Sequence, residues 1–148
     1  MVKLLLILMM IIFDMKYWLI KSEPNTWSIE QQENVVIEPW NGVRNYQARN
    51  NIKAMEIGDL CFFYHSVSQR KIVGIVEVFS DYRLDPSDDT MKFGLRDMKF
   101  IKKFSKGYSL DEVKMHPFLQ DMALLKQSRL SVQPITEIEW NIIMSLVE

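Results

Sequence analysis

The chain has 148 residues, the usual size of one compact domain, and this length argues against an enzyme built from two domains. Its 18 Lys and Arg residues against 19 Asp and Glu residues give a net charge of −1, which excludes a histone-like binder of nucleic acid that works through a basic tail. The single cysteine, Cys61, permits no internal disulfide, and with His65 and His116 it forms no Cys/His zinc pattern. The composition therefore favours a reducing compartment and no structural zinc.

The N-terminus is strongly apolar, since 12 of the first 13 residues are hydrophobic and residues 4–13 form an unbroken run. A helix that spans a bilayer needs about 20 such residues, so no transmembrane segment is predicted. A signal peptide needs small residues at its cleavage site, and the first alanine of the chain is Ala48. We interpret residues 1–14 as an extension before a physiological start at Met15. A strand or helix packed on the domain and an export signal are the alternatives.

The first part of the body predicts a strand, a short helix and a turn. Residues 17–21 form an apolar strand that ends before Pro24, because proline cannot donate to a continuing ladder. Ser28 and Gln31 have the spacing of a capping box and predict a short helix. Residues 39–42, with the sequence PWNG, predict a turn.

The middle of the chain predicts a helix, two strands and a loop. Asn45 is a good N-cap for a helix that reaches about Met55, with its apolar residues at helical spacing. Residues 60–64 are a continuous apolar run typical of a buried strand, and residues 72–79 predict a second strand that is rich in β-branched residues. Residues 80–90 contain four aspartates and a proline and predict a solvated loop.

The last third predicts one long strand region and further helices. The alternation of apolar residues between 93 and 104 slips by one position, which predicts a bulge near Asp97. Capping boxes open helices at 110–115 and 137–146, and residues 130–132 form a strand that ends near Pro134. The fold class is therefore α/β (α+β), with a mixed five- to six-stranded curled sheet and short flanking helices.

The stretch from Pro39 to Asn50 carries the clearest functional chemistry. It places Trp40, Arg44, Tyr46 and Arg49 around a glycine turn and a helix start. Aromatic faces stack on nucleic-acid bases, while arginines and helix N-termini hold phosphates. The alternative is structural, with the aromatic rings in the core and the arginines in solvent.

Five ordered motifs together resemble the EVE domain family of the PUA-like superfamily. They are YWLIKSEP at 17–24, PWNGVRNYQARN at 39–50, GDLCFFYHS at 58–66, IVGIVEV at 72–78 and RLSVQPI at 129–135. The resemblance covers residues 15–148. It implies a PUA-like pseudo-barrel with a pocket, and binding of nucleic acid that carries a modified base, notably modified cytosine.

The resemblance also implies which residues surround the pocket. By motif, Ser22 and Glu23 close one side. The mouth and wall are formed by Trp40, Val43, Arg44, Asn45 and Tyr46. The floor consists of Tyr64, His65 and Ser66, and the residues close to it are Arg129, Ser131 and Gln133.

Two functions are compatible with these residues. The first is a non-catalytic reader of modified bases in DNA or RNA. Such a reader is expected to be cytoplasmic, or nuclear in a eukaryote, and to need no cofactor, metal or membrane partner. The second is a small enzyme that acts on a modified nucleoside or small amide with Glu23 or His65 as acid or base. For the reader, we expect Trp40→Ala to abolish binding with the fold intact, and a shallow salt dependence because one captured base needs few phosphate contacts.

Overall fold

The computed structural model describes residues 2–6 and 15–147. Residues 2–6 form a short helix whose side chains Val2, Leu4, Leu5 and Leu6 are exposed. Residues 7–14, on which most of the predicted extension falls, lie outside the described residues, so the interpretation of residues 1–14 stays a prediction. None of the described helices combines the length and the hydrophobicity that crossing a membrane requires.

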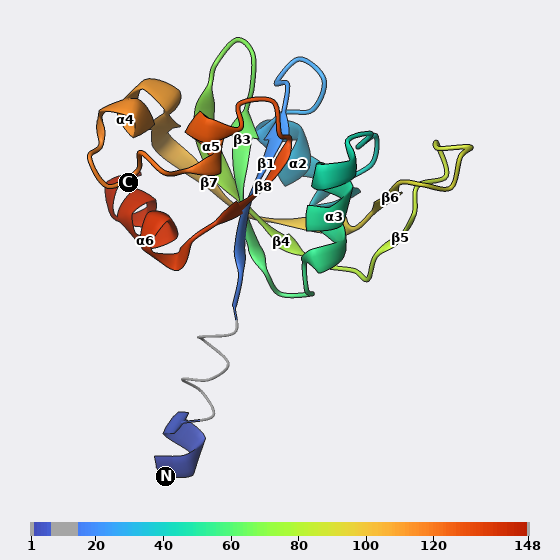
Figure 1. Cartoon of the computed structure of the whole chain (residues 1–148), viewed down its shortest axis with the longest axis horizontal. Coiled ribbons are helices and arrows are strands. Elements are labelled where there is room, and N and C mark those ends of the chain that lie inside the picture. Colours follow the sequence, from blue (N-terminus) through green and yellow to red (C-terminus); the bar gives the residue numbers. More distant parts are fainter. Residues whose placement is uncertain (1, 7–14, 148) are drawn as a thin grey trace.

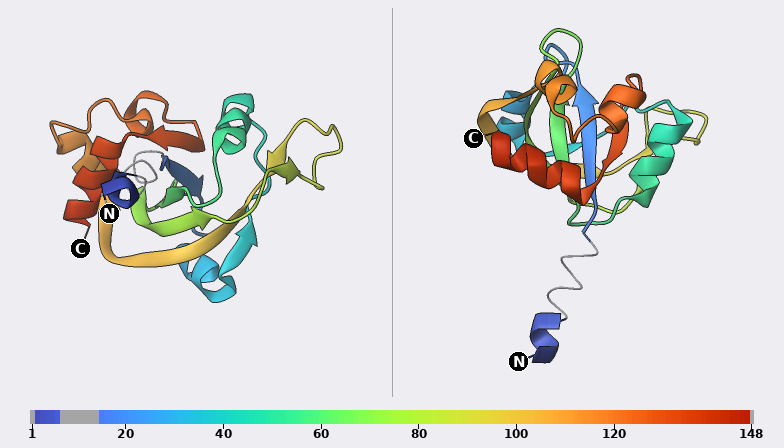
Figure 2. Two further views of the ribbon diagram at one scale, coloured as in Figure 1. Left: turned by 90° about the horizontal axis from the view of Figure 1, so that it is seen from below. Right: turned by 60° about the vertical axis from the view of Figure 1, so that its left-hand side comes forward.

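Six strands form one mixed sheet in the order β2-β7-β4-β3-β1-β8 (Figure 1). β1 (Tyr17–Ser22) runs parallel to β3 (Leu60–His65), and the other neighbours are antiparallel. The remaining strands are β2 (Ile37–Pro39), β4 (Lys71–Val78), β7 (Asp97–Ser109) and β8 (Val132–Ile135). The long β7 strand bends, and the sheet curls with it (Figure 2). This architecture confirms the expected fold class.

Short helices cover both faces of the sheet (Figure 1). They are α2 (Ile29–Val35), α3 (Tyr46–Ala54), α4 (Leu110–Met115), α5 (Ala123–Lys126) and α6 (Glu137–Leu146). The predicted capping residues are confirmed, because the side chains of Ser28, Asn45, Ser109 and Thr136 each accept a hydrogen bond from a backbone N–H of the first turn. Each cap satisfies a donor that has no partner within its helix.

The alternation of side chains along the strands divides the core into two parts, one on each face of the sheet. In β1, Trp18 and Ile20 face the part that packs under α2 and α3. Leu19 faces the other part, which packs under α4, α5 and α6. There the rings of Phe62 and Trp140 stack with centroids 3.9 Å apart. The sheet is therefore buried on both faces.

The predicted bulge near Asp97 is wrong, because the chain changes sheets there instead. β6 (Gly94–Leu95) pairs with β5 (Arg83–Leu84) in a separate two-stranded sheet, and β7 begins at Asp97. Between them lies Arg96, which is 7% exposed and donates to the carbonyl oxygens of Ile52, Ser80 and Lys53 over 2.7–3.2 Å. These bonds fix the point at which the chain changes direction.

Two boundaries also differ from the predictions. β8 continues through Pro134 to Ile135, because it is an edge strand and pairs on one side only, with β1. β2 was not predicted, and its residues Ile37–Pro39 pair with the start of β7. β2 is important for the site because it leads directly into the turn at Trp40.

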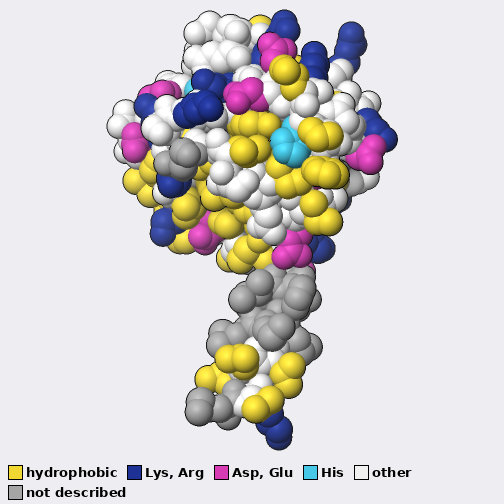
Figure 3. Space-filling model, turned by 90° about the vertical axis from the view of Figure 1, so that its left-hand side faces the viewer, with side chains coloured by type: hydrophobic (Ala, Val, Ile, Leu, Met, Phe, Trp, Pro, Cys, Tyr) yellow, Lys and Arg dark blue, Asp and Glu magenta, His cyan; other side chains and the backbone are white. Residues whose placement is uncertain are grey.

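The face of the molecule over α4 and α6 exposes apolar side chains (Figure 3). Met115, Phe118 and Ile138 are 84%, 75% and 71% exposed. A pocket on another part of the surface is lined by residues of β1, β2 and the turn before α3. The apolar face and the pocket are therefore separate surfaces.

Candidate functional site

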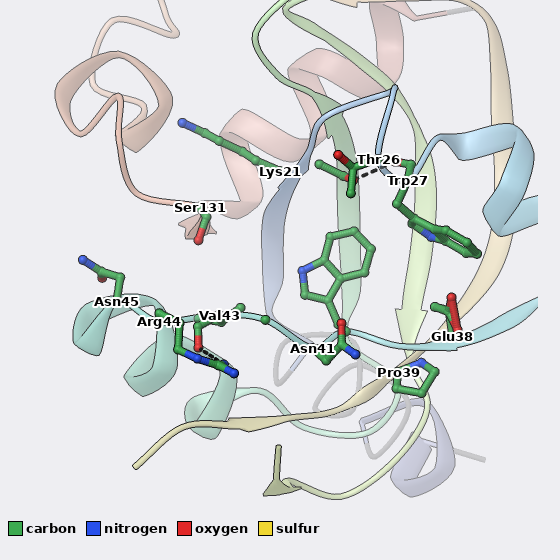
Figure 4. Close-up of a pocket in the computed structure, with 13 residues that line it drawn as sticks. Lys21, Thr26, Trp27, Glu38, Pro39, Asn41, Val43, Arg44, Asn45 and Ser131 are labelled. Carbon is green, nitrogen blue, oxygen red and sulfur yellow. Dashed lines mark hydrogen bonds between the residues drawn. The ribbon is translucent and has the colours of Figure 1, made fainter. Parts of the chain in front are cut away.

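An open pocket of about 670 Å³ lies between the end of β1, the strand β2 and the turn that leads into α3 (Figure 4). Its walls combine two tryptophans with polar side chains and the backbone of the turn. The lining residues are Lys21, Ser22, Thr26, Trp27, Glu38, Pro39, Trp40, Asn41, Gly42, Val43, Arg44, Asn45 and Ser131. The volume is in the range of pockets that hold small organic ligands.

Trp40 belongs both to the core and to the pocket wall. Its side chain is only 8% exposed, and its ring meets Phe63 edge to face with centroids 5.5 Å apart. The backbone N–H of Trp40 donates to the carbonyl oxygen of Arg96 over 3.0 Å. Among the described residues, none accepts a hydrogen bond from its indole N–H. Trp40 therefore offers a fixed aromatic surface and a donor to a ligand.

The turn after Trp40 is held by a buried carboxylate from a distant loop. Asp85 Oδ2 accepts from the backbone N–H of Gly42 over 2.8 Å and from Arg44 Nη1 over 3.1 Å. Asp85 Oδ1 accepts from the N–H and the hydroxyl of Ser87. Burial acts to raise the pKa of the Asp85 carboxyl, but these hydrogen bonds outweigh it and hold the pKa well below its usual range.

This anchor corrects the expectation that residues 80–90 form a solvated loop. The side chain of Asp85 is fully buried, and β5 lies in the same segment. Arg44 is also more constrained than its predicted phosphate-binding role implies, because its guanidinium is shared between Asp85, Ser87 and the carbonyl oxygen of Val43. Gly42 has φ +81°, a conformation that glycine adopts at little cost.

The opposite wall is built by a chain of hydrogen bonds behind Trp27. Ser22 Oγ donates to the carbonyl oxygen of Trp27 over 2.6 Å, and the indole N–H of Trp27 donates to Gln32 Oε1 over 2.9 Å. Gln32 is fully buried and its amide donates to the carbonyl oxygens of Val36 and Met98. The orientation of the Trp27 ring at the pocket is therefore fixed from the core.

Six of the residues singled out from the sequence line this one pocket. They are Ser22, Trp40, Val43, Arg44, Asn45 and Ser131. Four further lining residues were not predicted, namely Lys21, Thr26, Trp27 and Glu38. Glu38 was missed because β2 reaches the site through pairing with the distant β7. The remaining candidates lie elsewhere.

Tyr46 and Arg49 form a cluster on the exposed side of α3, outside the pocket lining. The ring of Tyr46 is 5.1 Å from that of Phe93, and the Arg49 guanidinium lies over Tyr46 at 4.9 Å. Arg49 Nη1 also donates to the carbonyl oxygen of Lys92. These side chains pack the β5–β6 hairpin against α3 and add no wall to the pocket.

The candidates from β3 and β8 lie in the interior. Tyr64 is 4% exposed and packs in the core under α4–α6. Gln133 is fully buried and donates to the carbonyl oxygens of Leu130 and Gln127. His65 is 2% exposed, its Nε2 accepts from the N–H of Ile29, and its Nδ1–H donates to Gln69 Oε1. His65 therefore supports the first turn of α2 and has no free ring nitrogen.

Replacing His65 with phenylalanine is expected to destabilise the fold by about 1–3 kcal/mol, because the N–H of Ile29 would lose its acceptor in a buried position. His116 provides the matched control, since its Nδ1 accepts from the N–H of Phe118 at an exposed position where water can replace it. Urea unfolding of His65→Phe and His116→Phe measures the difference. Equal losses in the two variants would contradict the supporting role of His65.

Of the last candidates, Glu23 and Arg129 are exposed and Ser66 is half-buried. Glu23 lies in the turn after β1, where its carbonyl oxygen accepts from the N–H groups of Thr26 and Trp27. The N–H of Ser66 donates to the carbonyl oxygen of Ser22. Arg129 lines a second cavity of about 370 Å³ that shares Asn45 with the pocket. Within residues 2–6 and 15–147, no three His, Cys, Asp or Glu side chains converge on a position that would hold a metal ion.

Comparison with known proteins identifies relatives across nearly the whole chain. A family model described as the EVE domain matches residues 16–146. Thymocyte nuclear protein 1 of Rattus norvegicus is 36% identical to the chain, over 89% of this chain and 74% of that protein. The crystal structure of a protein from Agrobacterium tumefaciens superposes with a TM-score of 0.84 and 44% identity, covering 88% of this chain and 92% of that chain.

A further relative was crystallised with a ligand. The human THYN1 protein, in complex with 5-methylcytosine containing DNA, is 30% identical, with a TM-score of 0.83 over 90% of this chain and 98% of that chain. The family expected from the five motifs is therefore confirmed, and the fold agrees with that of its members. The chain belongs to the EVE domain family.

Proposed function

We propose that the chain is a non-catalytic binding module that recognises a modified base, with 5-methylcytosine as the first candidate, in nucleic acid. One observation carries the proposal: the chain has an open pocket beside Trp40 and shares its fold with a human relative in complex with 5-methylcytosine containing DNA. The pocket offers the aromatic surface of Trp40 and Trp27 together with polar groups.

The chemistry of the pocket suits a single base turned out of its stack. A flipped base is read by stacking on aromatic side chains and by hydrogen bonds to its edge. Trp40 and Trp27 supply aromatic surface, and the side chains of Asn41 and Ser131 are polar groups at the opening (Figure 4). Lys21 is the lysine of the lining, and its Nζ donates to the carbonyl oxygen of Ser128 over 2.6 Å. Lys21 and Arg44 are the cations of the lining, and both are bonded within the protein, which supports the expected shallow salt dependence.

Binding of a duplex with one 5-methylcytosine is expected to be tighter than binding of the unmodified duplex by about fourfold, since one buried methyl group contributes about 0.8 kcal/mol. Ser131→Trp is expected to abolish both affinities, because its side chain at the opening would fill the space that the base needs. Fluorescence anisotropy at several salt concentrations measures the affinities of the unmodified chain and the variant for both duplexes.

Ser105→Trp is the matched control, because Ser105 is an exposed serine of β7 outside the pocket lining. Its affinity should equal that of the unmodified chain. Undiminished binding by a folded Ser131→Trp variant would show that nucleic acid binds elsewhere on the molecule.

No observation favours the enzymatic alternative. His65 has both ring nitrogens engaged, and the Glu23 side chain is not part of the pocket lining. An acid or base must lie within hydrogen-bond reach of the group that it serves, and neither residue faces the pocket.

A further inference from the structure

Glu38 is a pocket residue to which neither the five motifs nor the comparisons assign a role. It lies on β2, opposite Met98 of β7, and is half-buried in the pocket wall. Figure 4 shows Glu38 and Trp27 on one side of the opening, with Ser131 and Asn45 on the other. Glu38 is the one carboxylate among the residues that line the pocket.

The other charged and polar lining groups are largely engaged within the protein. Ser22 donates to the carbonyl oxygen of Trp27, and the Trp27 indole donates to Gln32. Arg44 bonds to Asp85, and Asn45 caps α3 through its side-chain oxygen. In contrast, no donor in the described part of the chain forms a hydrogen bond or ion pair with the Glu38 carboxylate. A half-buried acceptor without a protein partner gains most from a donor on a ligand.

The two bases that carry a methyl group at C5 differ in what they present to such an acceptor. Cytosine carries the N4 amino group, a donor, whereas thymine carries O4 at the same position and can only accept there. A carboxylate accepts from the amino group and is repelled by the carbonyl oxygen. 5-Methylcytosine and thymine are therefore separated by the exocyclic group and share the methyl group.

We propose that Glu38 determines the base specificity of the pocket by accepting a hydrogen bond from the exocyclic amino group of cytosine, and so excludes thymine. The inference rests on the proposed function and adds a second criterion to it. The methyl group is read by burial, and the amino group is read by Glu38. The carboxylate thus separates 5-methylcytosine from thymine, and the methyl group separates 5-methylcytosine from cytosine.

The test compares oligonucleotide duplexes that carry 5-methylcytosine, cytosine, thymine or guanine opposite an abasic site, so that no base pair has to be broken. The unmodified chain is expected to bind 5-methylcytosine about tenfold more tightly than thymine. In Glu38→Gln the amide presents either an oxygen or an N–H group, so thymine binding should rise and the ratio should fall to about twofold.

Glu33→Gln is the control for loss of charge, because Glu33 is exposed on α2 outside the pocket lining, and it should keep the tenfold ratio. Thermal unfolding confirms that both variants fold. Equal binding of thymine and 5-methylcytosine by the unmodified chain, or an unchanged ratio in Glu38→Gln, would overturn the role of Glu38. Tighter binding of guanine would overturn it as well, since guanine offers a carboxylate two donors. Equal binding of 5-methylcytosine and cytosine would instead contradict the proposed function.

Discussion

Asp85→Ala is expected to destabilise the fold by about 3 kcal/mol, chiefly because the N–H of Gly42 would lose a charged acceptor, a bond that contributes about 1.5–3 kcal/mol. The ion pair with Arg44 adds less, since the guanidinium is 40% exposed and partly screened by water. The variant should also lose at least about tenfold in affinity for the modified duplex, because the turn that carries Trp40 is no longer fixed. Urea unfolding and fluorescence anisotropy measure the two effects.

Asp89→Ala is the matched control, since Asp89 is exposed in the same loop, and its stability should lie within about 0.5 kcal/mol of the unmodified chain.

The pH dependence of the stability gives a second control. Hydrogen bonds hold the folded-state pKa of Asp85 below its unfolded value, so its contribution is complete above the ordinary carboxyl range and is lost as the pH falls toward the folded-state value. The difference between the unmodified chain and Asp85→Ala should therefore shrink below about pH 4. A difference that does not change with pH would contradict an ionised anchor.

The helices were predictable because their signals are local. Ser28, Ser109 and Thr136 each stand three residues before the side chain that completes the capping box, and the structure shows every one of these caps. Asn45 acts in the same way for α3. A cap needs only the residues of one turn, so its geometry does not depend on the rest of the fold.

The anchor of the pocket was not predictable, because its partners are distant in the sequence. Asp85 looks like its neighbours in an acidic loop, and nothing near it indicates that its carboxylate meets Gly42 and Arg44, 43 and 41 residues away. Arg96 is a similar case, since it bonds to Ile52 and Lys53 of the α3 region. It stands where the alternation of apolar residues between 93 and 104 slips, the slip from which a bulge was predicted. Burial of a charge depends on tertiary partners that the local sequence does not contain.

The motif at 58–66 shows why adjacent residues did not share one site. Successive side chains of a strand point to opposite faces. Phe63 therefore packs behind Trp40, whereas Tyr64 enters the core under α4–α6. The turn at residues 39–45 is irregular, so consecutive residues there can line one pocket, and Val43, Arg44 and Asn45 do so.

Trp40→Ala is expected to destabilise the fold by about 3–5 kcal/mol, which corrects the expectation that this variant keeps the fold intact. The reason is burial, since Trp40 is 8% exposed and its ring packs against Phe63 in the core. Loss of binding by this variant would therefore combine unfolding with loss of stacking. Its stability must be measured by urea unfolding before its affinity is interpreted.

Trp40→Phe separates the two effects, because a phenyl ring keeps the packing against Phe63 and removes the indole N–H and part of the stacking surface. We expect it to fold with a loss of about 1–2 kcal/mol. It should bind the modified duplex about tenfold more weakly, since it loses the indole N–H, whose hydrogen bond contributes about 0.5–1.5 kcal/mol, together with part of the stacking. Affinity is compared at a temperature where both proteins are fully folded. If a folded Trp40→Phe variant bound the 5-methylcytosine duplex as tightly as the unmodified chain, neither the indole N–H nor the larger ring surface of Trp40 would contribute to binding.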